Sequence, residues 1–198
     1  MTDIYVDMDG VIADFFGQIS KINNVEHWKQ IPDLTEALGK LNGTDFFVTL
    51  PKFKTSDQLV QFVKKITDNH WYILSSPLEG DIFNSSFWKS YWLKNNNYEP
   101  IEAIYAEDKY KYAVTKNPNI LIDDRPYNIK EWEKNGGIGI LYQANKDDFS
   151  KLKIEILQQV KILMRPQKKA IPNKDKGKEV NLNLCLSKKI LSQKILKN

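Results

Sequence analysis

Short apolar runs alternate with segments of helical periodicity along most of this chain, and this alternation restricts the fold more than any other feature. The runs are nearly continuously apolar, which is typical of strands that are buried on both faces. Strands that alternate with helices pair in parallel through right-handed crossovers. The expected strands are 4–7, 71–76, 103–106, 119–124 and 137–142, with helices at about 55–68, 86–96, 126–135 and 147–164. The sequence therefore predicts an α/β fold with a Rossmann-like, doubly wound, parallel five-stranded sheet.

The stretch from about 16 to 50 interrupts this alternation. It follows the first strand and contains Trp28, Pro32, a helix-like pattern over 34–41, and the pair Phe46 and Phe47. We expect it to form a small helical cap, inserted after strand 1 above the carboxyl edge of the sheet. Beyond 164 the chain becomes rich in Lys, Asn and Pro. We therefore divide the chain into a domain over 1–164 and a basic, flexible tail over 165–198.

The net charge of +4 is a property of the tail. Residues 165–198 contain ten basic and two acidic side chains, whereas the remaining 164 residues contain 19 basic and 23 acidic ones. The body is therefore mildly acidic and has no sign of a nucleic-acid-binding surface. We expect contact with nucleic acid to be weak at most, and to involve only the tail.

Three features bear on the compartment. No stretch approaches the roughly 18 apolar residues that a membrane span needs, so we expect no membrane association. The first strand begins at Ile4, which leaves no room for a signal peptide. Cys185 is the single cysteine and lies in the tail. A cytoplasmic, reducing location is the resulting expectation.

Two aspartates, Asp7 and Asp9, follow the first apolar run, and Gly10 comes directly after them. In an α/β fold the carboxyl ends of the strands carry the chemistry. A calcium-binding EF-hand loop is excluded, because its fifth position needs an oxygen ligand and here that position is Val11. A hairpin turn at Asp9-Gly10 is an equally good reading of these residues alone.

The other strand ends favour the chemical reading. Ser75 and Ser76 follow the second strand, and Asp123 and Asp124 end the fourth. Two lysines, Lys109 and Lys111, lie shortly before the fourth strand. Carboxylates are hard oxygen ligands that suit Mg²⁺, hydroxyls hold phosphoryl oxygens, and a lysine offsets their charge. A response-regulator receiver domain uses the same ingredients in a different order, so that reading is poor.

These residues resemble the four ordered motifs of haloacid dehalogenase-type phosphatases, and within that superfamily the 5'(3')-deoxyribonucleotidase family of phages and bacteria. The motifs are Asp7-Met8-Asp9-Gly10-Val11, Ile73-Leu74-Ser75-Ser76-Pro77, Lys109, and Leu121-Ile122-Asp123-Asp124-Arg125-Pro126. The Asp14-Phe15 pair, the aromatic run over 87–92 and the run over 128–137 extend the likeness. It covers about residues 3–142 and excludes the tail.

The resemblance implies a role for each motif residue. Asp7 would be the nucleophile that forms an aspartyl-phosphate, and Asp9 the general acid and base. Mg²⁺ would be held by Asp7, by the backbone carbonyl of Asp9 and by Asp124, with Asp123 in support. Ser75 and Ser76 would bind phosphoryl oxygens.

The sequence defines two features less well, namely the lysine of the third motif and the residues that bind the nucleotide phosphate. Lys109 is preferred over Lys111, because Tyr112 and Ala113 complete the spacing typical of the family. Some nucleotidases carry a lysine near the phosphate after the Ser-Pro of the second motif. Here Leu78 and Glu79 occupy that position, so the sequence does not define which residue binds the phosphate there.

The function implied is a Mg²⁺-dependent phosphatase that acts on nucleoside monophosphates. Phe15, Phe46 and Phe47 could contact a base or sugar; core packing is an equal reading for Phe15 and the preferred one for the other two. Alternatives are a phosphatase of another small ester or of a polynucleotide 3'-end, and a non-catalytic phosphate- or nucleic-acid-binding protein. The base preference, the choice of 5' or 3' phosphate and the oligomeric state stay open, with a homodimer among the options.

Overall fold

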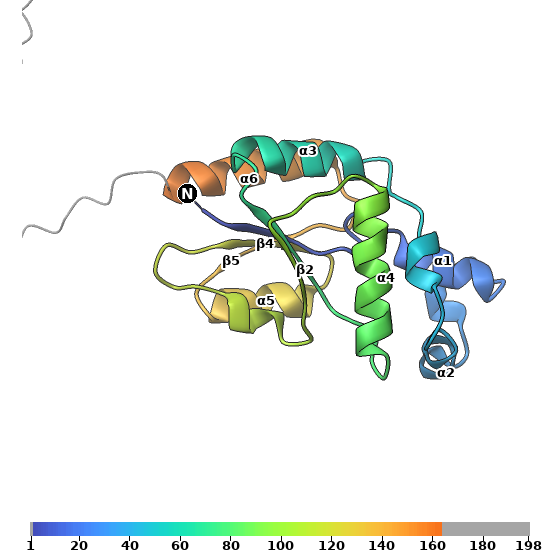
Figure 1. The fold of residues 1–198 in the computed structure, drawn as a ribbon. Coiled ribbons are helices and arrows are strands. Elements are labelled where there is room, and N and C mark those ends of the chain that lie inside the picture. The colour runs from blue at the N-terminus through green and yellow to red at the C-terminus, as the bar shows by residue number, and fades with distance from the viewer. Residues whose placement is uncertain (1, 164–198) are drawn as a thin grey trace, which may run out of the picture. The chain divides into compact units, whose positions relative to one another are not determined.

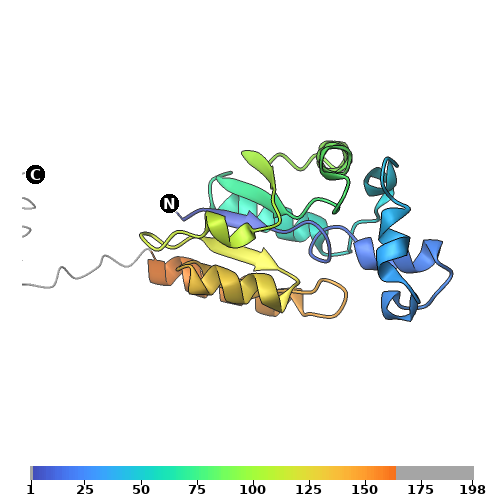
Figure 2. The same cartoon turned by 90° about the horizontal axis from the view of Figure 1, so that it is seen from below.

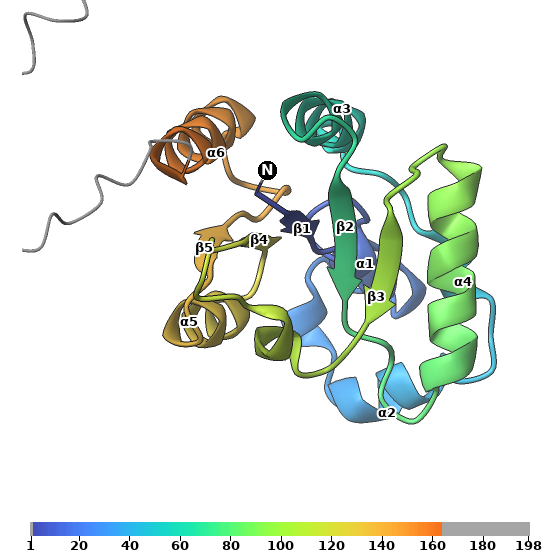
Figure 3. The same cartoon turned by 60° about the vertical axis from the view of Figure 1, so that its left-hand side comes forward.

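The computed structural model describes residues 2–163, so the predicted tail over 165–198 lies outside the described residues. A parallel sheet of five strands forms the centre of this part of the chain, in the order β3-β2-β1-β4-β5 (Figure 3). The strands are β1 (Ile4–Val6), β2 (Trp71–Ser75), β3 (Glu102–Tyr105), β4 (Ile120–Asp123) and β5 (Ile138–Leu141). The predicted five-stranded α/β fold is thereby confirmed, with each strand within two residues of its expected bounds.

Helices connect the strands and cover the sheet. They are α3 (Ser56–Ile66), α4 (Ile82–Asn95), α5 (Pro126–Lys134) and α6 (Phe149–Leu163). The α3 and α6 helices lie on one face and α5 lies on the other (Figure 1), and α4 flanks the side of β3 (Figure 3). A short 3-10 helix, η3 (Lys109–Tyr112), lies between β3 and β4. No helix within the described residues is both long enough and apolar enough to cross a membrane.

Four short helices occupy the segment between β1 and α3. They are α1 (Phe15–Ile22), η1 (Trp28–Gln30), α2 (Leu34–Gly39) and η2 (Phe46–Thr49). Aspartates start the two α-helices, because the Asp14 and Asp33 carboxylates accept hydrogen bonds from the Gly17 and Glu36 amides at 2.9 and 2.8 Å. Figure 2 shows these helices beyond the end of the sheet toward which the strands point. We call the segment 15–49 the insert.

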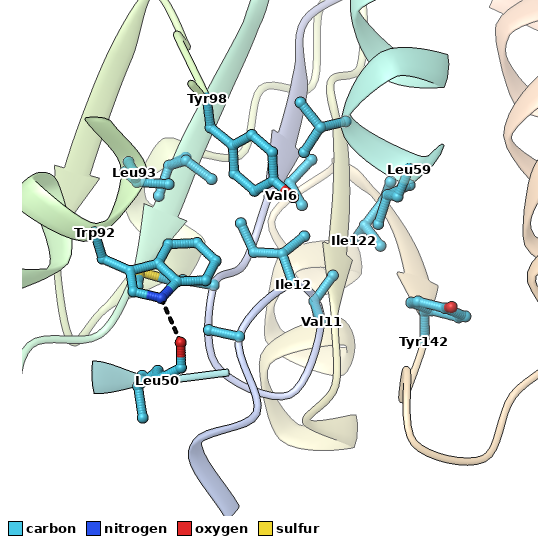
Figure 4. Close-up of a cluster of buried hydrophobic side chains, with 14 of the residues drawn as sticks. Val6, Val11, Ile12, Leu50, Leu59, Trp92, Leu93, Tyr98, Ile122 and Tyr142 are labelled. Carbon is cyan, nitrogen blue, oxygen red and sulfur yellow. Dashed lines mark hydrogen bonds between the residues drawn. The ribbon is translucent and has the colours of Figure 1, made fainter. Parts of the chain in front are cut away.

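The core continues from the sheet into the insert. Val6 and Ile122 are fully buried neighbours in the sheet, and Ile12 packs with them beneath α3 and α4 (Figure 4). The indole of Trp92 donates a hydrogen bond to the carbonyl of Leu50 at 2.7 Å, which ties α4 to the residue directly after the insert. Buried side chains therefore fix the insert to the sheet rather than leaving it on a free linker.

Candidate active site

Asp7 and Asp9 lie at the carboxyl end of β1, at the switch point of the sheet. The chain leaves β1 toward β2 and β3 on one side and then crosses from β3 back to β4 on the other side of β1, and this is where doubly wound folds open a binding crevice. Because Val6 pairs with Ile122 in the sheet, Asp7 comes beside Asp123. The Asp7 side chain is buried and accepts a hydrogen bond from the Met8 amide at 2.7 Å.

Gly10 turns the chain sharply after Asp9. Its φ is +79°, a left-handed conformation that favours glycine. A Cβ atom at this position would overlap the carboxylate of Asp124. The absence of a side chain at Gly10 therefore lets the turn after β1 approach the end of β4 closely.

Lys109 lies between two aspartates at the sheet edge. Its ammonium is 2.8 Å from the Asp7 carboxylate and 2.7 Å from that of Asp123, and its side chain is almost fully buried. Burial lowers the pKa of Lys109, but the two carboxylates outweigh burial and raise it above its ordinary value. Lys111 instead points to solvent and pairs with Asp108 at 2.8 Å. The structure brings Lys109, and not Lys111, to the predicted site.

Asp123 and Asp124 have different surroundings. Asp123 receives hydrogen bonds from Lys109, from the Asn128 amide group at 3.0 Å and from the Arg125 backbone amide at 2.8 Å. Asp124 has no hydrogen-bond donor to its carboxylate among the residues that the structure describes. Burial, followed by the negative charges of Asp7 and Asp123, raises the pKa of Asp124 to about 8.

The three carboxylates fit a divalent cation. Asp7, Asp123 and Asp124 each offer an oxygen within 4.8 Å of the others. Within the described residues, the Lys109 ammonium contacts two of these carboxylates, those of Asp7 and Asp123, which leaves negative charge uncompensated in a buried place. Hard oxygen donors with surplus negative charge are what Mg²⁺ binds in proteins. Asp124, whose carboxylate lacks a donor, is the ligand best placed to use such a cation.

A second buried lysine, Lys89, reaches the site from α4. Its ammonium is 2.7 Å from the Asp9 carboxylate, 3.1 Å from the Ser75 hydroxyl and 2.6 Å from the Ser76 carbonyl. Lys89 contacts one Asp9 oxygen, and the other, the buried Oδ1, has no hydrogen-bond partner within the described part of the chain. Burial raises the pKa of Asp9, and Lys89 offsets part of this effect.

Lys89 was missed in the sequence, where the place after the second motif holds Leu78 and Glu79. The lysine comes instead from the following helix, ten residues further along the chain than Glu79. A signal was available: Ser85, Lys89 and Trp92 share the buried face of α4 at helical spacing. A lysine among buried positions needs an anionic partner, and that need points to a site.

The predicted serines lie at the end of β2. The Ser75 side chain is fully buried and receives the hydrogen bond from Lys89, whereas Ser76 is half-buried. Both line a pocket of about 900 Å³ together with Asp7, Asp9 and Asp124. The structure thus gathers every predicted motif residue at one end of the sheet.

The pocket extends from the carboxylates to the insert. Phe15 is half-buried, lines the pocket and stacks on Phe47 with ring centres 6.0 Å apart. Phe46 is buried behind it and does not line the pocket. Phe16 and Trp28 also face the pocket, with ring centres 5.2 Å apart. Aromatic surface is therefore available at the end of the pocket away from the sheet.

No protein-family model and no curated protein matches the chain. Similar solved structures include a HAD family enzyme from Bacteroides thetaiotaomicron in a magnesium complex, at 14% identity and a TM-score of 0.48, over 77% of this chain and 98% of that one. A hydrolase from Pseudomonas syringae has 11% identity and a TM-score of 0.48, over 82% and 99%. Likeness at this level establishes neither a family nor an activity, so the chemistry has to be inferred from the site itself.

Proposed function

We propose that this chain is a Mg²⁺-dependent phosphatase of the haloacid dehalogenase type that hydrolyses nucleoside monophosphates. One observation carries the proposal: two aspartates at the end of β1 have distinct lysine partners. Lys109 binds Asp7 within a carboxylate cluster, and Lys89 binds one oxygen of Asp9 while the other oxygen has no partner in the described residues. Such a pair fits a nucleophile beside a general acid.

In the first step, a carboxylate oxygen of Asp7 attacks phosphorus and the bond to the ester oxygen breaks. Asp9, whose pKa burial raises, donates its proton to the departing oxygen and releases the alcohol. Lys89 and the Ser75 hydroxyl, which are 3.1 Å apart, would hold the phosphoryl oxygens. The product of this step is an aspartyl-phosphate at Asp7.

In the second step, Asp9 takes a proton from a water molecule that attacks the same phosphorus. The bond between phosphorus and the Asp7 oxygen breaks, so inorganic phosphate leaves and both carboxyl groups return to their starting state. A Mg²⁺ ion held by Asp7 and Asp124, with Asp123 in support, would offset the negative charge shared by the phosphate and the carboxylates.

The insert supports a nucleoside as the leaving group. The aromatic rings of Phe15, Phe16 and Trp28 line the pocket beyond the carboxylates. Aromatic side chains stack on nucleobases with little dependence on the base, at about 1–3 kcal/mol per base. A pocket of about 900 Å³ is large enough for a nucleotide.

Phosphate release tests the proposal. Purified protein with Mg²⁺ is expected to liberate phosphate from dUMP or dTMP, and Asp7→Asn is expected to lower the rate at least about 1,000-fold. Asp68→Asn is the matched control, because Asp68 is exposed and lies outside the pocket. If the wild-type protein is inert on a broad panel of phosphomonoesters, the proposed activity is wrong. Hydrolysis of non-nucleotide esters alone would retain the phosphatase and reject the nucleotide substrate.

A further inference from the structure

Three exposed cationic side chains, which we call the outer cations, line the pocket without an acidic partner in the described residues. They are Lys29 from η1, Arg125 directly after β4, and Lys146 from the connection between β5 and α6. None of the three belongs to an ion pair in the described chain, and all three are exposed. The inner lysines differ, because Lys89 and Lys109 are bound to carboxylates. The outer cations therefore keep their charge available for a ligand.

This concentration of positive charge does not follow from the composition. Residues 1–164 have a surplus of four acidic side chains, so an average surface of this domain is negative. Acidic groups line the same pocket, but most of them either accept a capping hydrogen bond or lie at the carboxyl end of the sheet. Asp14 caps α1, whereas Asp7, Asp9 and Asp124 lie at the sheet. Glu79 is the acidic residue that remains to oppose the three cations.

Two of the cations lie in segments whose backbone is fixed by hydrogen bonds. Lys29 lies in η1, whose first turn is closed by a reciprocal pair of bonds between His27 and Gln30. Lys146 lies in a turn where its amide donates to the Gln143 carbonyl at 3.0 Å, and the Gln143 amide donates to Asp147 at 2.7 Å. Backbone of this kind holds the side chains near the pocket at a reduced entropic cost of binding.

The turn that carries Lys146 is also joined to the catalytic end of the pocket. The Gln143 side chain donates to the Asp124 carbonyl at 2.7 Å, and the Ala144 amide donates to the Gly10 carbonyl at 3.0 Å. Figure 2 shows this connection between β5 and α6 reaching toward the insert, where Lys29 lies. The pocket thus has buried carboxylates that suit a cation with a phosphate, and exposed cations that suit a second anion.

We propose that the preferred substrate carries a second phosphate on its leaving group, which the exposed side chains of Lys29, Arg125 and Lys146 bind. This inference rests on the proposed function and specifies its substrate class. The second phosphate can belong to a nucleoside 3',5'-bisphosphate or to the phosphodiester of a short oligonucleotide with a terminal phosphate. Both present the same anionic oxygens to the three cations.

Competing substrates test the proposal on the full chain with Mg²⁺. The kcat/KM for thymidine 3',5'-bisphosphate is expected to exceed that for dTMP and for thymidine 3'-phosphate by about tenfold or more, and the ratio should fall as salt rises. Lys29→Gln and Lys146→Gln should each lower this ratio by about fivefold. Lys116→Gln is the matched control, because Lys116 is exposed and outside the pocket, and its ratio should equal that of the wild type.

A thymidine dinucleotide with a 3'-phosphate distinguishes the two sources of the second anion. A higher kcat/KM for the dinucleotide than for the bisphosphate assigns the outer site to a phosphodiester, and the reverse assigns it to a terminal phosphate. Equal kcat/KM for all substrates, with ratios unaffected by Lys29→Gln and Lys146→Gln, would overturn the inference while retaining the phosphatase.

A binding measurement keeps the inference testable if no ester is hydrolysed. Calorimetry with the Asp7→Asn protein and Mg²⁺ is expected to show tighter binding of the bisphosphate than of dTMP. The difference should be reduced when Lys146→Gln is added to Asp7→Asn. Equal affinities for the two nucleotides would reject the outer anion site independently of turnover.

Discussion

Two buried lysines give the aspartates at the end of β1 different surroundings. Lys109 contacts Asp7 and Asp123 together, whereas Lys89 contacts one oxygen of Asp9. As a result, Asp9 can hold a proton, while the neighbouring Asp7 carboxylate is paired with the Lys109 cation. The residues that separate the two roles are thus lysines from outside β1.

Lys89→Met tests how much the Asp9 ion pair contributes. The change keeps the apolar stem of the side chain but leaves the Asp9 carboxylate without a cationic partner. We expect the free energy of unfolding to fall by about 3 kcal/mol, the usual cost of breaking a buried pair. Turnover should fall at least about 100-fold, because the group near the phosphoryl oxygens is lost. Urea unfolding and phosphate release measure the two effects.

The double variant Asp9→Asn/Lys89→Met separates folding from chemistry. Both charges are removed, so most of the lost stability should return while the protein stays inactive. Lys116→Met serves as the control for the loss of a lysine, because Lys116 is exposed and lies outside the pocket. A double variant as unstable as Lys89→Met alone would show that Lys89 acts through packing and not through its charge.

Gly10→Ala tests the close approach of the β1 turn to Asp124. Gly10 and Gly43 both have a positive φ, of +79° and +71°, but an added Cβ meets the Asp124 carboxylate only at Gly10. Both alanine variants should lose about 1 kcal/mol through backbone strain. Only Gly10→Ala should raise the Mg²⁺ concentration needed for half-maximal activity, by about tenfold or more. An equal Mg²⁺ requirement in the two variants would contradict the assigned role of Gly10.

At the scale of elements, the strands were readable because they are buried on both faces. Burial demands continuous apolar runs, and β4 shows the result, with Ile120, Leu121 and Ile122 fully buried. The helix α4 was expected at about 86–96 but begins at Ile82. Its first turn hides the usual pattern, because Ile82 and Phe83 are exposed whereas the buried residue is the polar Ser85. The Ser85 hydroxyl donates to the Asp81 carbonyl at 2.7 Å and accepts from the Leu78 amide at 2.9 Å. Local patterns do not record such tertiary bonds.

Some residues of the candidate site could likewise be predicted from the sequence and others could not. Asp7, Ser75 and Asp123 could be predicted, because strand ends of a parallel sheet meet at one edge whatever the details of the loops. Helical spacing could mark Lys89 as buried, but the contacts of Lys89 and Lys146 with the pocket could not be predicted, because each comes from a segment whose placement depends on packing across the whole domain. The choice of Lys109 over Lys111 could be predicted only in part, since it depends on η3, which directs Lys109 inward and Lys111 to solvent.

A hydrogen-bond network at the surface links α3 to two connecting segments and makes the stability depend on pH. Asp57 in α3 accepts hydrogen bonds from the Tyr98 hydroxyl at 2.5 Å and from Lys52 at 2.9 Å. The Tyr98 bond, followed by Lys52, lowers the pKa of Asp57. A lowered carboxyl pKa stabilises the fold above the ordinary pKa, and this stabilisation is lost as pH falls through the folded value.

Asp57→Asn should therefore lower the free energy of unfolding at pH 7 by about 0.5–1 kcal/mol, a modest amount because the side chain is 55% exposed. The difference from the wild type should shrink below about pH 4, where the ordinary carboxyl group is also protonated. Urea unfolding between pH 3 and 7 measures it. A difference that is independent of pH would show that the ionised carboxylate does not stabilise the fold.

At the scale of the whole domain, the site is assembled from segments that are distant in sequence. The pocket receives Asp7 and Asp124, which directly follow β1 and β4, Trp28 from the insert, Lys89 from α4 and Lys146 from the connection before α6. No single segment could hold this arrangement without the sheet. A ligand that binds such a site binds the folded state and not the unfolded one, so it should stabilise the entire domain.

Mg²⁺ is expected to show this coupling through Asp124, whose pKa is raised to about 8, mainly by burial. The folded protein holds the Asp124 proton more tightly than the unfolded chain, so without Mg²⁺ stability should decrease as pH rises from about 4 to 8. Mg²⁺ competes with this proton, so the rise in melting temperature that it causes should be larger at pH 8 than at pH 6. Asp124→Asn should remove both effects, whereas Asp68→Asn should retain them. A rise in melting temperature that Asp124→Asn leaves intact would mean that Mg²⁺ binds elsewhere on the protein.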